Sequence, residues 1–205
     1  MEFEKFGKLS RWSRPIIITE KLDGTNAQIG IEEADPTKSA SEFIVSRIVA
    51  EDKVYDVYAG SRTRWLKPGK QTDNYGFAEW VHENAGVLVG ILGEGRHYGE
   101  WWGQSIQRNY DLPYRRFSLF NVSKWGHLPS VDDAEEDSLV LCVPQIFQGY
   151  LTDDLISLLM DELKENGSYA APGFKNPEGI VIFHTHGNVA FKKTFEGDEY
   201  GKGNV

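Results

Sequence analysis

The chain contains 205 residues, of which 40% are hydrophobic and 13% aromatic, and it carries a formal net charge of −9. This length and composition allow a folded core, whereas the negative charge argues against general coating of nucleic acid, because that mode of binding neutralises many phosphates. The apolar runs are too short to cross a bilayer, the first residues are charged, and the single cysteine, Cys142, excludes an internal disulfide, so we expect a cytoplasmic protein without a membrane segment.

Most of the chain consists of short apolar segments separated by Gly, Asn, Asp and Pro, a pattern typical of β-strands. The segments are rich in Val, Ile, Phe and Tyr, which favour a pleated and half-buried surface. The predicted strands cover residues 15–19, 25–31, 43–49, 54–60, 87–94, 117–122, 139–143, 179–184 and 188–195.

The first of two predicted helices covers residues 72–86. The apolar period of a helix places Phe77, Trp80 and Val81 on one face of this segment, and Gly86 is its predicted end.

The second predicted helix covers residues 152–167, with four leucines on one face, Thr152 or Asp153 as the N-cap and Gly167 as the end. Few strand pairs are separated by a helix. We therefore predict an α+β fold with mainly antiparallel sheets and flanking helices, rather than a doubly wound parallel sheet. The acidic run 132–137 is predicted to be a solvated loop.

A charged tetrapeptide, Lys21 to Gly24, separates the apolar segment PIII from the strand-like segment TNAQIGI. A lysine attacks phosphorus only as the free amine, so nearby cations, a metal ion or partial burial must favour loss of its proton. Asp23 can orient this amine or organise the turn that Gly24 permits. Taken alone, the tetrapeptide is more typical of an ordinary edge-strand lysine followed by an Asp-Gly hairpin turn.

Further segments place polar side chains at the ends of predicted strands. Arg62 and Arg64 occupy alternate positions, from which arginines can hold phosphate or ribose oxygens. Glu100 stands before two tryptophans and can accept a hydrogen bond from a sugar hydroxyl. The structural alternatives are solvent-facing arginines and a strand whose aromatic residues pack in the core.

The last part of the chain predicts a hairpin that carries charged residues. Glu178 immediately precedes an apolar strand, and a short turn leads back through Lys192 and Lys193. Such a hairpin would bring a metal-binding carboxylate and a phosphate-binding lysine to one site. Because neighbouring residues of a strand point in opposite directions, the two lysines cannot both face this site in the same way.

Taken in order, these segments resemble the motifs of the covalent nucleotidyltransferase superfamily, which contains ATP-dependent ligases and capping enzymes. EKLDGTN is similar to motif I, GSRTRWL to motif Ia, YGEWWG to motif III, FSLFNV to motif IIIa, PEGIVI to motif IV and VAFKKT to motif V. The resemblance spans residues 19–194. It implies the ligase adenylyltransferase fold, with a nucleotide cleft between sheets. It also implies a single minimal domain over residues 1–205, because the ten residues after the motif V segment leave no room for an OB-fold or another C-terminal domain.

The resemblance implies catalytic roles at the matching positions. Lys21 would be the nucleophile that takes AMP from ATP through a phosphoramidate bond. Glu178 would bind the divalent metal, Mg²⁺ or Mn²⁺, and Lys192 or Lys193 would contact the α-phosphate. The family usually separates these two lysines by one residue, so their individual roles stay open.

The resemblance also implies a set of nucleotide-binding residues. Glu20 and Asn26 would help to hold adenine and phosphate. Arg62 would hold the ribose or a phosphate, Glu100 the ribose hydroxyls, and Phe120 would stack on adenine. The family more often has Asp after this phenylalanine, so Phe117 is the alternative for stacking. The predicted nucleotide-binding residues are Glu20, Asp23, Asn26, Arg62, Glu100 and Phe120.

Asn26 favours an RNA substrate, since DNA ligases similar in motif I generally carry arginine there. Segments 99–110 and 115–125 also look like those of small RNA-ligase-domain proteins, including phage ones. We therefore expect an ATP-dependent RNA ligase acting on RNA ends or nicked RNA duplex, with end sealing that involves an accessory protein or a preferred RNA shape. The alternatives are a DNA nick-sealing ligase, a nucleotide- or RNA-binding module without turnover, and a metal site at His184 and His186.

Overall fold

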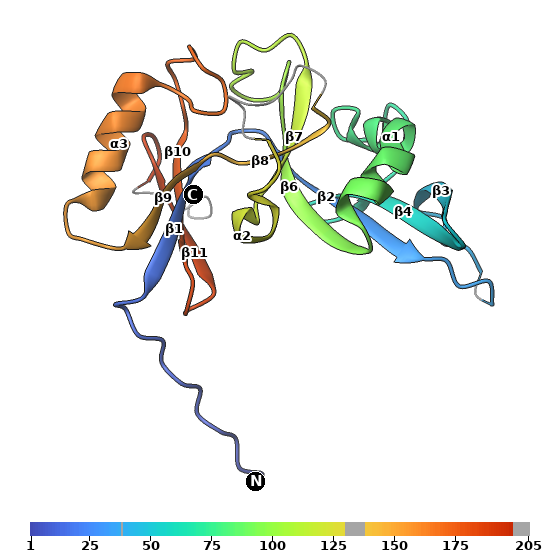
Figure 1. Ribbon diagram of the computed structural model, residues 1–205, viewed down its shortest axis with the longest axis horizontal. Coiled ribbons are helices and arrows are strands. Elements are labelled where there is room, and N and C mark those ends of the chain that lie inside the picture. Colours follow the sequence, from blue (N-terminus) through green and yellow to red (C-terminus); the bar gives the residue numbers. More distant parts are fainter. Residues whose placement is uncertain (38, 130–137, 199–205) are drawn as a thin grey trace. The chain divides into compact units, whose positions relative to one another are not determined.

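A computed structural model describes residues 1–37, 39–129 and 138–198, so the acidic run 132–137 lies outside the described residues. The chain divides into two compact units, one containing Met1–Leu22 and Val143–Val205 and the other Asp23–Cys142. Each unit has its own sheet (Figure 1). Each also has its own apolar core. The single minimal domain expected from the sequence stays a prediction.

The first unit is built on a four-stranded antiparallel sheet with the order β11-β10-β1-β9. Helix α3, Leu155–Asn166, packs Leu159, Met160 and Leu163 against Ile18 and Ile180 of the sheet. The strands are β1 Pro15–Lys21, β9 Gln145–Tyr150, β10 Gly179–His184 and β11 Val189–Thr194.

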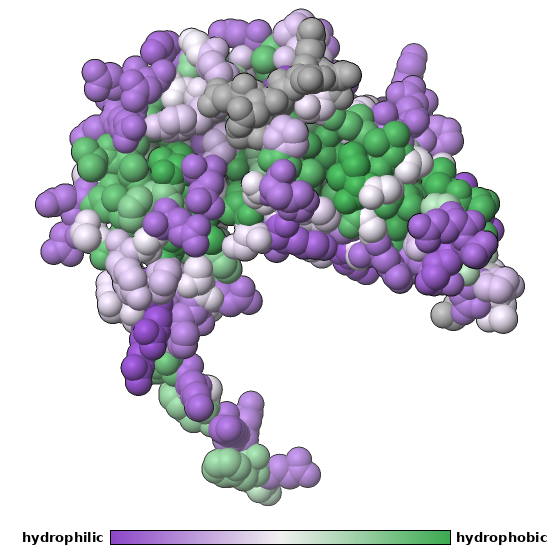
Figure 2. Space-filling model, in the orientation of Figure 1, coloured by the Kyte–Doolittle hydropathy of each residue, from purple (hydrophilic) through white to green (hydrophobic). Residues whose placement is uncertain are grey.

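Residues 1–14 precede β1 and form no helix or strand. They lead away from the sheet of the first unit (Figure 1), and their hydrophobic and hydrophilic side chains both stand in the open (Figure 2). In the described residues no helix has both the length and the apolar character that a membrane span requires.

The second unit contains a seven-stranded sheet with the order β3-β4-β2-β6-β7-β8, and β5 pairs with β4. Neighbouring strands are antiparallel except β7 and β8, which are parallel. The strands are β2 Thr25–Glu33, β3 Ile44–Ala50, β4 Lys53–Ser61, β5 Trp65–Leu66, β6 Gly95–Gly103, β7 Arg115–Leu119 and β8 Val140–Cys142.

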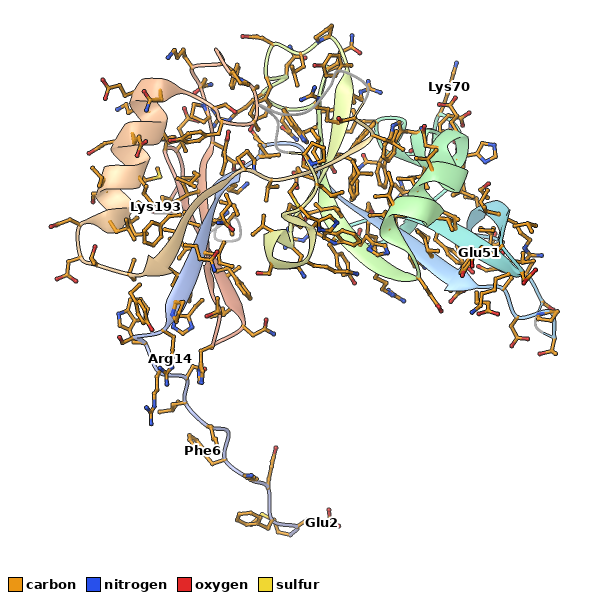
Figure 3. The ribbon with its side chains drawn as sticks, viewed as in Figure 1. Glu2, Phe6, Arg14, Glu51, Lys70 and Lys193 are labelled. Carbon is orange, nitrogen blue, oxygen red and sulfur yellow. The ribbon has the colours of Figure 1, made fainter. Side chains whose placement is uncertain are left out.

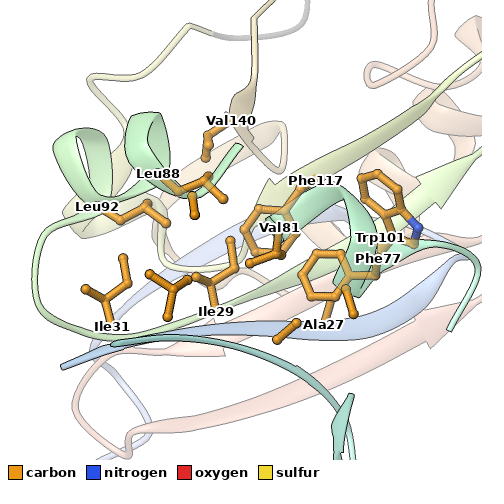
Figure 4. Packing of buried hydrophobic residues seen from close by; sticks show 14 of the residues in the cluster. Ala27, Ile29, Ile31, Phe77, Val81, Leu88, Leu92, Trp101, Phe117 and Val140 are labelled. Atoms are coloured by element: carbon orange, nitrogen blue, oxygen red, sulfur yellow. The ribbon is translucent and has the colours of Figure 1, made fainter. Parts of the chain in front are cut away.

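The core of the second unit lies between α1, Phe77–Leu92, and one face of this sheet. Alternate residues of β2, Ala27, Ile29 and Ile31, project toward the helix, as Figure 4 shows. Cys142 is buried in the same core, as the sequence predicts, and burial raises the pKa of its thiol to about 11. The predicted α+β class with mainly antiparallel sheets is confirmed.

The strand predicted over residues 87–94 is wrong, because this segment continues α1 to Leu92. Its buried residues, such as Leu88, follow the helical period of the preceding turns, although the run of Val, Leu and Ile looked like a strand. Gly86 does not end the helix. It lies on the exposed face, and the helix ends instead at Gly93, whose φ is 66°.

Other boundaries also differ from the prediction. The segment 117–122 is a strand only to Leu119, because the Asn121 side chain accepts a hydrogen bond from the Lys124 amide and begins the short helix α2, Val122–Trp125. Strands β5 and β9 were not predicted, and β6 was considered only as the structural alternative for the segment around Glu100. β6 has three glycines among its nine residues, which hides the apolar alternation of a strand.

One prediction concerns Gly99 of β6. A Cβ atom there would lie 2.4 Å from the Ser118 carbonyl oxygen and 2.7 Å from the Phe117 ring, so Gly99→Ala should lower the free energy of unfolding by about 1–3 kcal/mol. Gly86→Ala is the control, because nothing lies within 4 Å of its Cβ position and a helical alanine should add about 0.5–1 kcal/mol. Urea unfolding measures both, and equal effects of the two substitutions would contradict the packing argument.

Candidate active site

Lys21 is the last residue of β1, a strand that is buried along most of its length. Its Nζ donates a hydrogen bond to Oε2 of Glu178 at 2.5 Å, and the two side chains are only 23% and 18% exposed. Glu178 directly precedes β10, and Gly179 is paired with Lys21 in the register of the sheet. The sheet therefore brings together two residues that lie 157 positions apart in the sequence.

Gly179 allows this close approach. Its φ is 148°, and a Cβ atom there would lie 2.1 Å from the Lys193 carbonyl oxygen. Both the backbone conformation and the neighbouring strand therefore require glycine. The Glu-Gly pair of the predicted motif IV thus places the carboxylate of Glu178 beside β1.

The strand register separates the two lysines of β11. Thr19 pairs with Val181, which pairs with Lys192, so Lys192 projects from the same face of the sheet as Lys21, two positions along β1. Lys193 is paired with Ile180 and projects from the opposite face of the sheet. There its Nζ donates to Oδ2 of Asp198 at 2.5 Å.

Glu20 lies in the interior of the first unit, with only 1% of the residue exposed. Its carboxylate accepts hydrogen bonds from Ser168 Oγ at 2.6 Å and from the Ala170 amide at 2.9 Å. Burial raises the pKa of this carboxyl, and the hydrogen bonds oppose the shift. The side chain therefore fastens the segment after α3 to β1, while direct contact of Glu20 with a nucleotide stays a prediction.

In the second unit, Asn26 and Glu100 are neighbours across β2 and β6. Asn26 Nδ2 donates to one oxygen of Glu100 and the Gly24 amide donates to the other, both at 3.1 Å. A Cβ atom on Gly24 would lie 2.4 Å from the Trp101 carbonyl oxygen, so glycine is required here as well. The carboxylate of Glu100 thus joins the predicted motif I to motif III.

Asp23 is held by two residues that the sequence did not single out. Arg108 Nε donates to Oδ2 of Asp23 at 3.0 Å, and the Tyr110 hydroxyl accepts the Asp23 amide hydrogen at 2.8 Å. The ring of Tyr110 also packs edge-on against Trp102. These contacts favour the role of Asp23 as an organiser of the turn, which was one of the two roles expected.

The loop after β6 holds Arg108 and Tyr110 in place with an unusual backbone. Five of its residues have φ between 44° and 62°, although none is glycine. Each residue held in this left-handed region costs on the order of 1–3 kcal/mol, unless its side chain suits the conformation, as asparagine does. Only the surrounding contacts can maintain such a loop, and its sequence gives little warning of it. The five residues are Ser105, Gln107, Asn109, Tyr110 and Asp111.

Two other predicted nucleotide-binding residues are exposed. Arg62 lies in the turn after β4, and the register between β2 and β4 places it level with Asn26. Phe120 is 42% exposed at the end of β7. Phe117, the alternative for stacking, is fully buried against Phe77 and is not accessible to a nucleotide.

The described residues contain no group of three or more His, Cys, Asp and Glu side chains that could hold a metal by themselves. Glu178 offers one accessible carboxylate, and this suits Mg²⁺ or Mn²⁺, which is commonly held by one or two carboxylates together with substrate phosphates and water. Both ring nitrogens of His184 are already used, by the Trp12 carbonyl at 2.9 Å and by the Gly187 amide at 2.9 Å. This argues against a metal site at His184 and His186.

The chain was compared with known proteins. A model of the RNA ligase family matches residues 14–195. No curated protein matched the chain.

Solved structures of Naegleria gruberi RNA ligase resemble the chain in fold. A variant with ATP and Mn aligns with a TM-score of 0.54 and 18% identity over 90% of this chain and 51% of that chain. A variant with AMP and Mn aligns with a TM-score of 0.53 and 17% identity, and the protein with PPi with a TM-score of 0.53 and 18% identity. Each of these alignments covers 89% of this chain and 50% of that chain. The chain therefore spans about half the length of these structures. At such identities the likeness shows the fold alone.

The burial of Glu20 predicts a pH dependence of stability. Its pKa is raised above the usual 4.5, so just above pH 4.5 the native state holds more protons than the unfolded chain and the free energy of unfolding falls as pH rises. Glu20→Gln cannot titrate. The free energy of unfolding of the wild type minus that of Glu20→Gln should therefore decrease from pH 4.5 toward neutral pH in urea unfolding experiments. A difference that stays constant with pH would contradict the raised pKa.

Proposed function

This chain belongs to the RNA ligase family, and from that premise we propose that it is an ATP-dependent RNA ligase that forms a covalent lysyl-AMP intermediate on Lys21. The observation that carries the proposal is the ion pair between Lys21 and Glu178, which are the predicted nucleophile and metal ligand. The two side chains meet at one end of β1, and Lys192 projects from the same face of the sheet. This arrangement suits attack on a phosphate more than a purely structural role.

In the first step, Nζ of Lys21 attacks the α-phosphorus of ATP. A P–N bond forms, the bond to the bridging oxygen breaks, and pyrophosphate leaves. The amine must give up a proton before it attacks. Its hydrogen bond to Glu178 Oε2, at 2.5 Å from Nζ, holds it beside the proposed metal ligand.

The remaining residues bind and orient the nucleotide. Lys192 would place a positive charge beside the α-phosphate, where negative charge builds up during transfer. Asn26 and Glu100 would bind the nucleoside, with Arg62 on ribose or phosphate and Phe120 stacked on adenine. Glu178 would hold the divalent cation, which neutralises charge on the phosphates and orients them for attack.

The second step transfers AMP to an RNA end, and the third step seals the two RNA ends. The AMP moves from Lys21 to the 5′-phosphate of an RNA end, which breaks the P–N bond and forms a new phosphoanhydride. A 3′-hydroxyl then attacks the RNA phosphate and displaces AMP. Because the chain spans about half the length of the solved ligases that it matches, sealing by this chain with an accessory protein, or on a preferred RNA shape, is part of the proposal.

The first test of this function is the AMP adduct. Mass spectrometry of the wild-type protein incubated with ATP and Mg²⁺ or Mn²⁺ should show an added AMP, and pyrophosphate should remove it. Lys21→Ala should show none, because no other amine takes its place, while its circular dichroism and melting temperature stay close to those of the wild type.

Three outcomes would decide against the proposal. An AMP adduct on a well-folded Lys21→Ala variant would exclude Lys21 as the nucleophile. ATP binding by the wild type without any adduct would favour a nucleotide-binding module without turnover. Joining of DNA ends as readily as RNA ends would favour the DNA nick-sealing alternative.

A matched pair of variants tests the two lysines of β11. Lys192→Ala should slow AMP transfer to the protein by about 100-fold or more, as expected when a fixed positive charge is removed from a phosphoryl-transfer site. Lys193→Ala should leave the rate near that of the wild type, since Lys193 lies on the opposite face and its exposed pair with Asp198 contributes little to stability. The reverse order of the two rates would contradict the assignment.

A further inference from the structure

The segment before β1 exposes an unusual number of large apolar side chains. Phe3, Phe6, Leu9 and Trp12 are between 70% and 93% exposed, although side chains of this size are normally buried. They recur at every third position. Their exposure indicates that this segment contacts something outside the described chain.

The same segment carries a second series with the same spacing. Lys5, Lys8, Arg11 and Arg14 also recur at every third position, and residues 5–14 contain these four cations and no acidic residue. The whole chain has a net charge of −9, so the remainder carries −9 − 4 = −13. Positive charge is therefore concentrated in residues 5–14, within the segment that stands away from the sheet of the first unit (Figure 1 and Figure 3).

A period of three suits an extended chain of the polyproline II type, which has three residues per turn and no internal hydrogen bonds. In that conformation the apolar side chains form one edge and the cations a second. Glu4, Gly7, Ser10 and Ser13 occupy the third edge. A β-strand would instead send successive members of each series to opposite faces.

The base of this segment is fixed to the hairpin of β10 and β11. His184 Nε2 bonds to the Trp12 carbonyl oxygen at 2.9 Å, and the two rings stack with centroids 6.2 Å apart. The Thr185 amide and hydroxyl both donate to the Pro15 carbonyl oxygen, at 3.2 Å and 2.6 Å. Residues 1–11 thus project from a defined point rather than from a loose end.

This point lies at the end of β1 opposite to Lys21. Six residue steps separate Pro15 from Lys21, and at about 3.3 Å per residue this is roughly 20 Å. The twelve residues before Ser13 can reach up to about 40 Å when extended. The segment leads away from the sheet (Figure 1) and can therefore contact a polymer that extends beyond the reacting lysine.

We propose that residues 3–14 form an RNA-binding arm, whose aromatic edge stacks on unpaired bases and whose cationic edge follows the phosphates. This inference rests on the proposed function, because that function supplies RNA as the substrate. Exposed aromatic side chains beside cations are the combination that single-stranded nucleic acid requires, since bases stack on rings and Lys or Arg neutralise the backbone. The strong negative charge of the rest of the chain repels a polyanion, and the arm provides local attraction.

The test compares two full-length variants that lose the same charge. The arm variant is K5Q/K8Q/R11Q/R14Q, and the control is K53Q/K70Q/K124Q/K164Q, which neutralises four exposed lysines of the folded units. Fluorescence anisotropy measures binding of a labelled single-stranded RNA of about 20 nucleotides at several salt concentrations. With about 0.7 units of slope per phosphate contact, the arm variant should lose on the order of 3 units from the dependence of log K on log salt. The control should keep most of the wild-type slope.

RNA length provides a second readout. An RNA of about four nucleotides spans roughly 14 Å at 3.4 Å per nucleotide, less than the distance from Lys21 to the base of the arm. The arm variant should bind this short RNA as the wild type does and bind the long RNA more weakly. A third variant, F3A/F6A/L9A, should weaken binding of the long RNA while retaining most of the salt slope, because it removes stacking and keeps the cations.

The outcomes separate the arm from the proposed function. If the arm variant forms the AMP adduct normally and loses affinity only for long RNA, the arm is supported. Equal losses in the arm and control variants, or none in the arm variant, would overturn the inference while the adduct still supports the ligase. If the wild type forms no adduct but shows the arm effect, the ligase proposal fails and the arm stands. Arm-dependent sedimentation with phosphatidylserine vesicles, without any effect on RNA, would assign the arm to membranes instead.

Discussion

The pairing of Lys21 with Glu178 is the constraint on which the rest of the candidate site depends. The ion pair joins a lysine and a carboxylate at 2.5 Å, both mostly shielded from solvent, and holds the amine at one position. The pair exists because β1 and β10 are neighbours in one sheet, and because Gly179 lets β11 approach so closely. Chemistry at this position is therefore a property of strand order rather than of any single segment.

Around this pair, the motif I segment is fastened on both sides by buried polar contacts. Glu20 holds the segment after α3 in the first unit, while Asp23 and Gly24 are bound by Arg108 and Glu100 in the second. Polar groups that lose contact with water are costly unless they are paired, so the contacts on each side fix the part of motif I that belongs to that unit. The left-handed residues of the loop after β6 show that the fold tolerates local strain to keep this geometry.

Sequence patterns predicted much of the fold, and their failures have physical reasons. The α+β class and the β10–β11 hairpin follow from alternation and turn residues, which act locally. The run 87–94 was assigned to a strand because an apolar segment of that length fits either state, and only packing against the sheet makes it helical. No sequence pattern pointed to Arg108. Its position depends on the backbone path of its loop, and contacts with residues distant in the sequence maintain that path.

The sequence by itself determined the residue types of the candidate site, their order along the chain and the likeness to nucleotidyltransferase motifs, because these are properties of short segments. Only the tertiary structure decided which of the two adjacent lysines shares a face with Lys21, since a one-residue change of strand register exchanges the faces. It alone also showed that Glu20 points into a core and Phe117 is closed to ligands. The burial of a side chain depends on which residues from the rest of the chain pack around it, and a local sequence pattern does not contain that information.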